Sequence, residues 1–254
     1  MIGAIIQART GSSRFPQKIF AEIGGIPLLR LVVERCKLST HIGRVVVATT
    51  CSSSDDRVVD ACEKWGVSTF RGSEEDVLRR FAEAATTFDI DIVVRVTADD
   101  PFKDPDIIDR AIELLVSSPE MDYVSNTVHP TYPEGLDIEV FHRKALLQAD
   151  REASLPSERE HVTPFIWKRS KDFRIFNFEA DEDFSHLRWT IDYPRDLTMM
   201  NELVDLTQMS PIDVRMRDLL AVVEKHPHLA SNSGVTARNE GYLRSVDEER
   251  KDVQ

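Results

Sequence analysis

The chain has 254 residues, of which 41% are hydrophobic and 30% are charged, and this composition is typical of a globular protein with a buried core. Its formal net charge is −12 at pH 7, so a nucleic-acid partner would be repelled and is not expected. No apolar run approaches the roughly 20 residues needed to cross a bilayer, and the N-terminus lacks the pattern of a signal peptide. We therefore expect a cytoplasmic protein with no membrane partner.

Strand and helix patterns alternate through the first half of the chain. Short apolar or β-branched runs predict strands, and apolar residues at helical spacing predict the helices between them. In chain order the predicted elements are strand 1–6, helix 26–38, strand 44–50, helix 54–66, strand 67–73, helix 74–88, strand 91–97 and helix 105–118. This order predicts an α/β fold with a doubly wound, mostly parallel sheet that helices cover on both faces.

The second half of the chain mixes strand and helix patterns less regularly. The predicted elements are strands 122–127, 137–142, 173–180 and 187–191, and helices 143–153, 158–170, 194–208 and 212–226. We expect residues 1–226 to form one domain, in which about residues 122–190 make a mixed α+β lobe that caps the sheet or forms a subunit contact. Residues 227–254 are polar and lack periodicity, which predicts a mobile tail.

A cluster of cations follows the first predicted strand, in the segment Gln7–Lys18. Arg9, Arg14 and Lys18 are the cations, and the small residues among them are Gly11, Ser12 and Ser13. The segment has neither the Gly-Lys-Ser/Thr of a Walker A loop nor the GxGxxG of a dinucleotide-binding fold. A loop at the carboxyl end of the first strand often binds phosphate, so these residues predict a triphosphate site. On residue types alone, a solvated basic turn is the alternative.

Two aspartates follow predicted strands elsewhere in the chain. Asp99 comes after the strand that ends at Thr97, and Asp192 comes after the strand 187–191. Carboxylates are natural magnesium ligands, and the carboxyl ends of parallel strands meet at one edge of a sheet. An acidic turn is the alternative for Asp99, and a helix N-cap is the alternative for Asp192. Together with the basic loop, the two aspartates predict a shared site for magnesium and phosphate.

Four further residues are candidates for substrate binding. Three of them crowd a turn around Gly135 that leads into a strand, so this turn is either a substrate loop or a solvated hairpin. The fourth is a histidine on a predicted helix, where it either contacts substrate or is structural. These candidates are Glu134, Asp137, Glu139 and His161.

The segment IIQARTGSSRFPQKIF resembles the N-terminal signature ARxxSxRxPxK of the sugar-acid cytidylyltransferases. The matching residues are Ala8, Arg9, Ser12, Arg14, Pro16 and Lys18. Further blocks, among them FRGSEEDVLRRFAEAA, VVRVTADDPFKDPDIID, YPEGLDIEVF and LRWTIDYPRDL, are similar to the SpsF-like branch, named for spore-coat polysaccharide biosynthesis. The chain departs from the family pattern at Gln17, where glycine is usual, and at Asp100 and Phe102 around the metal-site proline.

The resemblance implies a Rossmann-like nucleotidyltransferase fold, CTP as donor, a magnesium cofactor and a homodimer built through the mixed lobe. The acceptor would be a sugar acid or a related hydroxyl compound, used for surface polysaccharide biosynthesis. Arg14, Lys18, Asp99 and Asp192 would be catalytic, and the two aspartates would hold the metal. Ala8, Arg9, Gly11, Ser12 and Ser13 would complete the nucleotide site with Arg14, Lys18 and Asp99, while Arg71 and Ser73 are our candidates for the base pocket.

Two other functions stay open at this point. A nucleotide-sugar glycosyltransferase of the GT-A type would share the strand-end aspartates, but it typically has an Asp-x-Asp arrangement, whereas this chain reads Ala98-Asp99-Asp100-Pro101. A non-catalytic nucleotide-binding subunit would keep the fold and need neither aspartate. Pyrophosphate release from CTP distinguishes a cytidylyltransferase from both.

Overall fold

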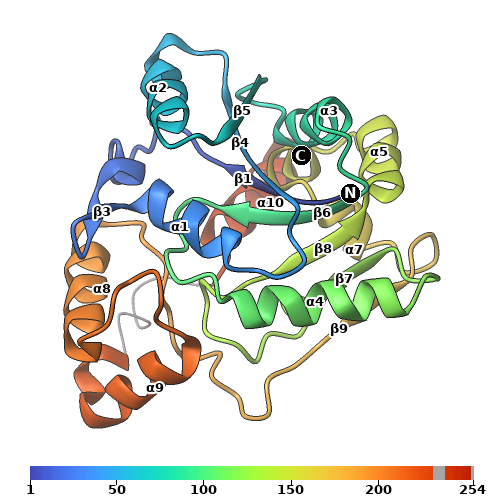
Figure 1. Ribbon diagram of the computed structural model, residues 1–254. Helices are drawn as coiled ribbons and strands as arrows, with labels where there is room; N and C mark the ends of the chain where they lie inside the picture. The colour runs from blue at the N-terminus through green and yellow to red at the C-terminus, as the bar shows by residue number, and fades with distance from the viewer. Residues whose placement is uncertain (231–237, 253–254) are drawn as a thin grey trace.

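A seven-stranded sheet forms the centre of the computed structural model, which describes residues 1–230 and 238–252 (Figure 1). The strand order is β5-β4-β1-β6-β8-β7-β9, and only the pairs that include β8 are antiparallel. The strands are β1 (Ile2–Gln7), β4 (Arg44–Thr50), β5 (Ser68–Gly72), β6 (Ile92–Thr97), β7 (Tyr123–Ser125), β8 (Glu139–His142) and β9 (Ile175–Asn177), with a separate pair β2 (Glu22–Ile23) and β3 (Ile26–Pro27). The predicted mostly parallel α/β sheet is confirmed.

Helices cover both faces of this sheet. They are α1 (Leu28–Lys37), α2 (Asp56–Lys64), α3 (Val77–Thr87), α4 (Pro105–Ser117), α5 (Arg143–Glu152), α6 (Pro156–His161), α7 (Pro164–Trp167), α8 (Pro194–Thr207), α9 (Met216–Lys225) and α10 (Glu240–Asp252), with 3₁₀ turns η1 (Lys18–Phe20), η2 (Ser53–Asp55) and η3 (Pro227–Ala230). None of the helices in the described ranges is long and apolar enough to span a bilayer.

Alternate side chains of the central strands belong to two different hydrophobic cores. Ala4 and Ile6 of β1 pack in a core with α1, α2, α4, α8 and α9, whereas Ile5 packs in a second core with α3, α5 and α7. Successive side chains of a strand point to opposite faces, so a continuous apolar run such as that of β1 is buried on both. The buried central strands hold the loops at their carboxyl ends in place.

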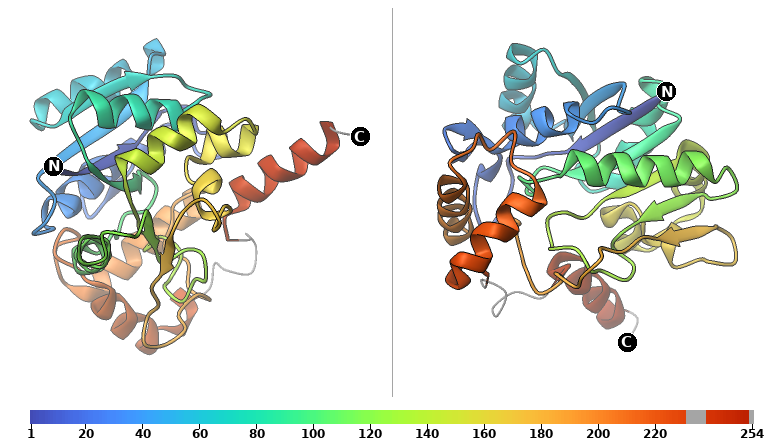
Figure 2. Two further views of the ribbon diagram at one scale, coloured as in Figure 1. Left: turned by 90° about the vertical axis from the view of Figure 1, so that its right-hand side faces the viewer. Right: turned by 60° about the horizontal axis from the view of Figure 1, so that its bottom comes forward.

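The second half of the chain extends the same sheet. β8 pairs with β6, and β7 pairs with β8 and β9, so the mixed lobe has no separate sheet of its own. Figure 2 shows these strands continuing the sheet away from β1 and β4. The lobe therefore forms one wall of the region beside the carboxyl end of β6.

Two predicted elements differ in the structure. The helix expected over 158–170 is divided into α6 and α7, because the chain bends at Val162, whose φ is 72°, and Pro164 begins a new turn. The strand expected over 187–191 is only an extended segment with one bridge, between Glu134 and Arg188. Gly135 lies so close to this segment that a Cβ there would be 2.6 Å from the Trp189 carbonyl oxygen.

The prediction that residues 227–254 lack regular structure is wrong for 240–252, which form α10. This helix is mostly polar, and it is anchored to α6 rather than buried by an apolar face of its own. Ser245 donates a hydrogen bond to Glu160 Oε2 at 2.7 Å, and the Tyr242 ring lies edge-on to His161 with centroids 5.3 Å apart. The C-terminal end of α10 points away from the body of the protein (Figure 2). Residues 231–237 and 253–254 of the predicted tail lie outside the described residues.

Candidate active site

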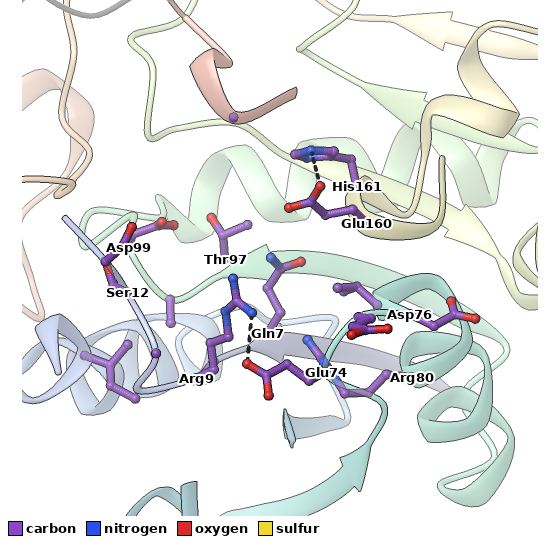
Figure 3. Close-up of a pocket in the computed structure, with 18 of the residues that line it drawn as sticks. Gln7, Arg9, Ser12, Glu74, Asp76, Arg80, Thr97, Asp99, Glu160 and His161 are labelled. Atoms are coloured by element: carbon purple, nitrogen blue, oxygen red, sulfur yellow. Dashed lines mark hydrogen bonds and ion pairs between the residues drawn. The ribbon is translucent and has the colours of Figure 1, made fainter. Parts of the chain in front are cut away.

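A cavity of about 670 Å³ lies beside the carboxyl ends of β1 and β6. The loop after β1 forms much of its wall, and the loop residues that line it are Ala8, Arg9, Gly11, Ser12, Ser13, Arg14 and Lys18. Thr97 at the end of β6 and Asp99 just after it also line the cavity, and Asp99 lies beside Ser12 of this loop (Figure 3). The cation-rich loop therefore faces a cavity in the structure, as a triphosphate site requires, although its binding role stays a prediction.

Lys18 joins the two aspartates that the sequence predicts to share a site. Its Nζ donates to Asp99 Oδ2 at 2.8 Å, to Asp192 Oδ1 at 3.2 Å and to the Ile191 carbonyl oxygen at 2.9 Å. Burial lowers the pKa of Lys18, but the two carboxylates outweigh this effect and the net pKa is raised. Burial likewise raises the pKa of Asp99, but the Lys18 ammonium brings the net pKa down to about 2. Lys18 and Asp99 are therefore both charged at neutral pH.

Asp192 is held by further cations. Arg14 Nη2 donates to Asp192 Oδ1 at 2.7 Å, and Arg188 Nη2 donates to Asp192 Oδ2 at 2.6 Å. The N-cap alternative for Asp192 is not what the structure shows, since Asp196 accepts the backbone N–H groups of Asp192 and Tyr193 instead. Asp192 does not itself line the cavity, but it contacts Lys18 and Arg14, which do.

The backbone brings the two aspartates together. The Ile191 N–H donates to the Asp99 carbonyl oxygen at 2.9 Å, and the Trp189 N–H donates to the Glu134 carbonyl oxygen at 2.7 Å. Because Gly135 has no Cβ, the extended segment 187–191 can pack closely against the turn at Gly135. Asp192 thus reaches the edge of the sheet without belonging to a full strand.

The two candidates for the base pocket do not line the cavity. Arg71 turns toward the loop after β4, where it donates to the carbonyl oxygens of Thr50 at 2.9 Å and Ser52 at 2.8 Å and pairs with Asp56 at 2.7 Å. Ser73 instead accepts the Asp76 N–H at 3.0 Å. The residues of this segment that do line the cavity are Glu74, Glu75, Asp76, Val77 and Arg80 (Figure 3). The lining residues thus begin directly after the two candidates, and the position of the base stays a prediction.

The three acidic candidates for substrate binding lie outside the cavity wall. Glu139 is buried, where it accepts hydrogen bonds from Tyr123 and Thr163, both at 2.6 Å, and pairs with Arg95. Asp137 pairs with Arg238. The structure therefore places Glu139 and Asp137 in ion pairs within the protein, and the third candidate, Glu134, is also ion-paired, with Arg188.

Glu134 contacts the active-site network indirectly. Arg188 Nε lies 3.4 Å from Glu134 Oε2, and the Asn239 N–H donates to Oε1 at 3.2 Å. Burial, with a smaller contribution from Asp137, raises the pKa of Glu134 to about 7. Glu134 is therefore the end of a chain of charged groups that begins at Asp99.

His161 does line the cavity. Its Nε2 lies 3.1 Å from Ser245 Oγ and 3.6 Å from Glu160 Oε2. Burial, reinforced by Arg95 and Arg244, lowers the pKa of His161 to about 4, even though Glu160 acts in the opposite direction. The imidazole is neutral at pH 7, so it presents a polar but uncharged surface to the cavity.

Sequence reasoning missed the contribution of α10 to this site. Gly241 and Arg244 line the cavity, and Glu240 Oε2 accepts a hydrogen bond from Arg14 Nη1 at 2.7 Å. The one available signal was the block RNEGYLRS, which resembles the C-terminal end of SpsF-like proteins. A polar stretch with few apolar residues does not show this role by periodicity.

The described residues contain no cluster of three or more His, Cys, Asp and Glu side chains that could hold a metal ion. The pair Asp99 and Asp192 nevertheless converges on one cation, the Lys18 ammonium. Magnesium is commonly bound by one or two carboxylates together with water and substrate phosphates. The donor set therefore fits a magnesium ion that is held jointly by the protein and a bound triphosphate.

A mostly parallel α/β sheet with a cation-rich loop beside a strand-end carboxylate is an arrangement typical of nucleotide-binding transferases. The profile of the cytidylyltransferase family matches residues 3–238. The chain is 32% identical over 235 residues to the spore coat polysaccharide biosynthesis protein SpsF of Bacillus subtilis, covering 89% of this chain and 95% of that protein. The chain thus belongs to the cytidylyltransferase family and is a CTP-dependent nucleotidyltransferase.

Two further similarities agree with this assignment. A solved cytidylyltransferase structure from Leptospira borgpetersenii serovar Hardjo-bovis has a TM-score of 0.86 and 34% identity, covering 93% of this chain and 99% of that one. The 3-deoxy-manno-octulosonate cytidylyltransferase of Geobacter metallireducens is 41% identical over 118 residues, which is 46% of this chain and 45% of that protein. The predicted family and nucleotidyltransferase fold are confirmed.

Proposed function

We propose that the protein transfers CMP from CTP to a hydroxyl group of an acidic sugar, with release of pyrophosphate, in the biosynthesis of a surface polysaccharide. The observation that carries this proposal is the convergence of Asp99 and Asp192 on Lys18, beside the loop that presents Arg9 and Arg14. The names of the relatives, a spore coat polysaccharide protein and an octulosonate cytidylyltransferase, support the class of acceptor.

In this reaction the acceptor oxygen attacks the α-phosphorus in line with the departing pyrophosphate. The new oxygen–phosphorus bond forms as the bond between the α-phosphorus and the bridging oxygen breaks. Arg9, Arg14 and Lys18 would bind the β- and γ-phosphates and stabilise the charge that grows on them. Since phosphoryl transfer needs little covalent participation by the protein, positioning and charge neutralisation would provide most of the catalysis.

Magnesium would be the cofactor, with Asp99 and Asp192 as its protein ligands. The bound ion would neutralise phosphate charge and orient the reacting groups. Lys18 now lies between the two carboxylates, and its ammonium would have to move from them toward the phosphates. The same lysine thus keeps the two carboxylates together before substrate binds.

We also propose a homodimer that forms through the mixed lobe. β9 is one of the two edge strands of the sheet, the one at the end formed by the mixed lobe, and Phe176 on it is 41% exposed. An exposed edge strand with an aromatic side chain is a suitable contact for a second copy of the chain. Light scattering coupled to size-exclusion chromatography tests this part of the proposal.

Pyrophosphate release tests the proposed function. The enzyme is incubated with magnesium, CTP and a panel of sugar acids that begins with 3-deoxy-manno-octulosonate, and UTP, ATP and GTP serve as controls. We expect release that requires both CTP and a sugar acid. A glycosyltransferase would instead release a nucleotide from a nucleotide sugar, and a non-catalytic subunit would release nothing.

A further inference from the structure

Arg80 is a buried guanidinium at the cavity wall, and the proposed chemistry does not use it. The residue lies on α3, is 2% exposed and lines the cavity. Its Nη1 donates to the Ser73 carbonyl oxygen, but its Nε is buried without a hydrogen-bond partner. Within residues 1–230 and 238–252 it forms no ion pair. A buried cation in this state is costly unless a ligand completes its hydrogen bonds.

The position of Arg80 is built into the fold. A Cβ at Gly72, the last residue of β5, would lie 2.9 Å from Arg80 Cγ, so only glycine leaves room for the arginine side chain to pass. Burial and the neighbouring Arg9 both lower the pKa of Arg80, to about 10, and it remains protonated at neutral pH. The chain thus makes space for a charged group that its described residues do not neutralise by an ion pair.

Arg80 and the predicted metal ligand Asp99 are at opposite ends of the cavity. In Figure 3 Asp99 and Ser12 lie at one end, Arg80 and Asp76 lie at the other, and Arg9 is between them. If the triphosphate follows the loop from Arg9 to Lys18, as the proposed function requires, the other end of the nucleotide is directed toward Arg80. That end is the base.

We infer that Arg80 selects the pyrimidine base of the nucleotide by donating hydrogen bonds to the O2 and N3 atoms of cytosine; this inference depends on the proposed function. A guanidinium offers only donors. Cytosine presents two acceptors there, whereas uracil carries a hydrogen on N3 that would meet a donor. Glu74 also lines this end of the cavity, and its half-exposed carboxylate is an acceptor for the exocyclic amine of cytosine. Uracil has a carbonyl oxygen at that position, which a carboxylate repels.

Equilibrium binding to Arg80→Met tests the inference. Calorimetry with magnesium compares CTP, UTP and inorganic tripolyphosphate on the wild type, on Arg80→Met and on the control Arg79→Met, whose arginine pairs with Glu83 on the exposed side of α3. A hydrogen bond to a charged group contributes about 1.5–3 kcal/mol, so CTP should bind Arg80→Met about 10- to 100-fold more weakly. The preference for CTP over UTP should be lost, and tripolyphosphate should bind as it does to the wild type.

Two results would overturn the inference. If Arg80→Met weakens tripolyphosphate as much as CTP, Arg80 belongs to the phosphate site. If it keeps the wild-type preference for CTP over UTP, Arg80 only supports the loop at Ser73. A wild-type enzyme with no preference for CTP would instead contradict the proposed function, so the two failures are distinguishable.

A second measurement does not depend on the folding of the variant. The wild-type enzyme is titrated with 3-deaza-CTP, in which a carbon replaces the N3 acceptor. We expect at least about tenfold weaker binding than CTP, because one charge-assisted hydrogen bond is lost. Equal affinity for the two nucleotides would show that no protein donor binds N3 and would overturn the inference.

Discussion

The two ends of the cavity treat their charges in opposite ways. At one end Lys18, Asp99 and Asp192 neutralise one another, with Arg14 and Arg188 as further partners of Asp192. At the other end Arg80 is more deeply buried, yet it has no ion pair among the described residues. Under the proposed function, substrate would therefore have to rearrange the ion pairs at the first end, whereas at the second end it would only supply hydrogen-bond partners. We therefore expect the ion pairs at the phosphate end to be replaced by contacts with the phosphates. At the base end, we expect the side chain of Arg80 to keep its position.

Removing the carboxylate that faces the cavity should have the largest effect. Asp99→Asn leaves the shape of the side chain but removes the charge that would hold magnesium, so turnover should fall by about 10²–10³-fold or more. Pyrophosphate release at saturating CTP measures the loss, and Asp60→Asn on the exposed side of α2 is the control. Turnover within a few-fold of the wild type would show that Asp99 is not a metal ligand.

Lys18→Ala should lower turnover by about 10²-fold, because one preorganised cation near the departing pyrophosphate is lost. Lys37→Ala, which removes an exposed lysine on α1, is the matched control. Unchanged turnover at saturating CTP would assign the loop to the solvated basic turn that the sequence left open.

The affinity of Lys18→Ala for a metal ion, measured without nucleotide, tests whether Lys18 and the ion compete for the two aspartates. Lys18 is the cation that now lies between the two aspartates, so Lys18→Ala should bind manganese more tightly than the wild type when no CTP is present. Electron paramagnetic resonance of free manganese measures this change. Weaker binding by the variant would show that Lys18 organises the carboxylates instead of competing with the ion.

Glu240→Gln tests the contact between α10 and the phosphate loop with a smaller expected effect. Glu240 is one of two carboxylate partners of Arg14, and it would compete with a phosphate for that guanidinium. A part-exposed ion pair of this kind is worth about 0.2–1 kcal/mol, so the KM for CTP should fall up to about fivefold. Glu248→Gln, on the exposed surface of α10, is the control. A higher KM would mean that Glu240 positions Arg14 for substrate.

The last prediction concerns stability rather than activity, and it is a pH dependence that originates at Glu134. Its pKa is about 7 in the folded protein and lower in the unfolded chain, so the folded state binds the proton more tightly. Stability should therefore decrease as pH rises from about 4.5 to 7, and Glu134→Gln should remove this part of the decrease. Urea denaturation at several pH values measures it. If the free energy of unfolding of Glu134→Gln falls with pH as steeply as that of the wild type, the decrease does not originate at Glu134.

The sequence predicts the parts of the site that are local. A cation cluster after a buried strand is conspicuous in an acidic chain, and Asp99 follows its strand directly, so both could be placed without the structure. The convergence of Asp192 was also predictable, although the segment before it proved to be extended chain and not a strand. Gly135, which permits this passage, was recognised only as a turn residue.

The remaining site residues depend on contacts that no local pattern shows. Arg80 stands in a helical segment beside the surface residue Arg79, and only the space above Gly72 shows which of the two is buried. The helix α10 has too few apolar residues to be predicted from periodicity. Contacts with side chains on α6 hold it in place, and these contacts leave no local pattern in the sequence. Arg71, our candidate for the base pocket, does not line the cavity, since its partners lie in the loop after β4.

Transfer of label from CTP tests the central claim most directly. The enzyme is incubated with magnesium, a sugar acid and CTP labelled with ³²P at either the α- or the γ-phosphate, and the products are separated. The proposed function predicts that the α-label appears in the sugar product and the γ-label in pyrophosphate. Appearance of the γ-label in the sugar, or of both labels only in unreacted CTP across the whole panel of sugar acids, would contradict it.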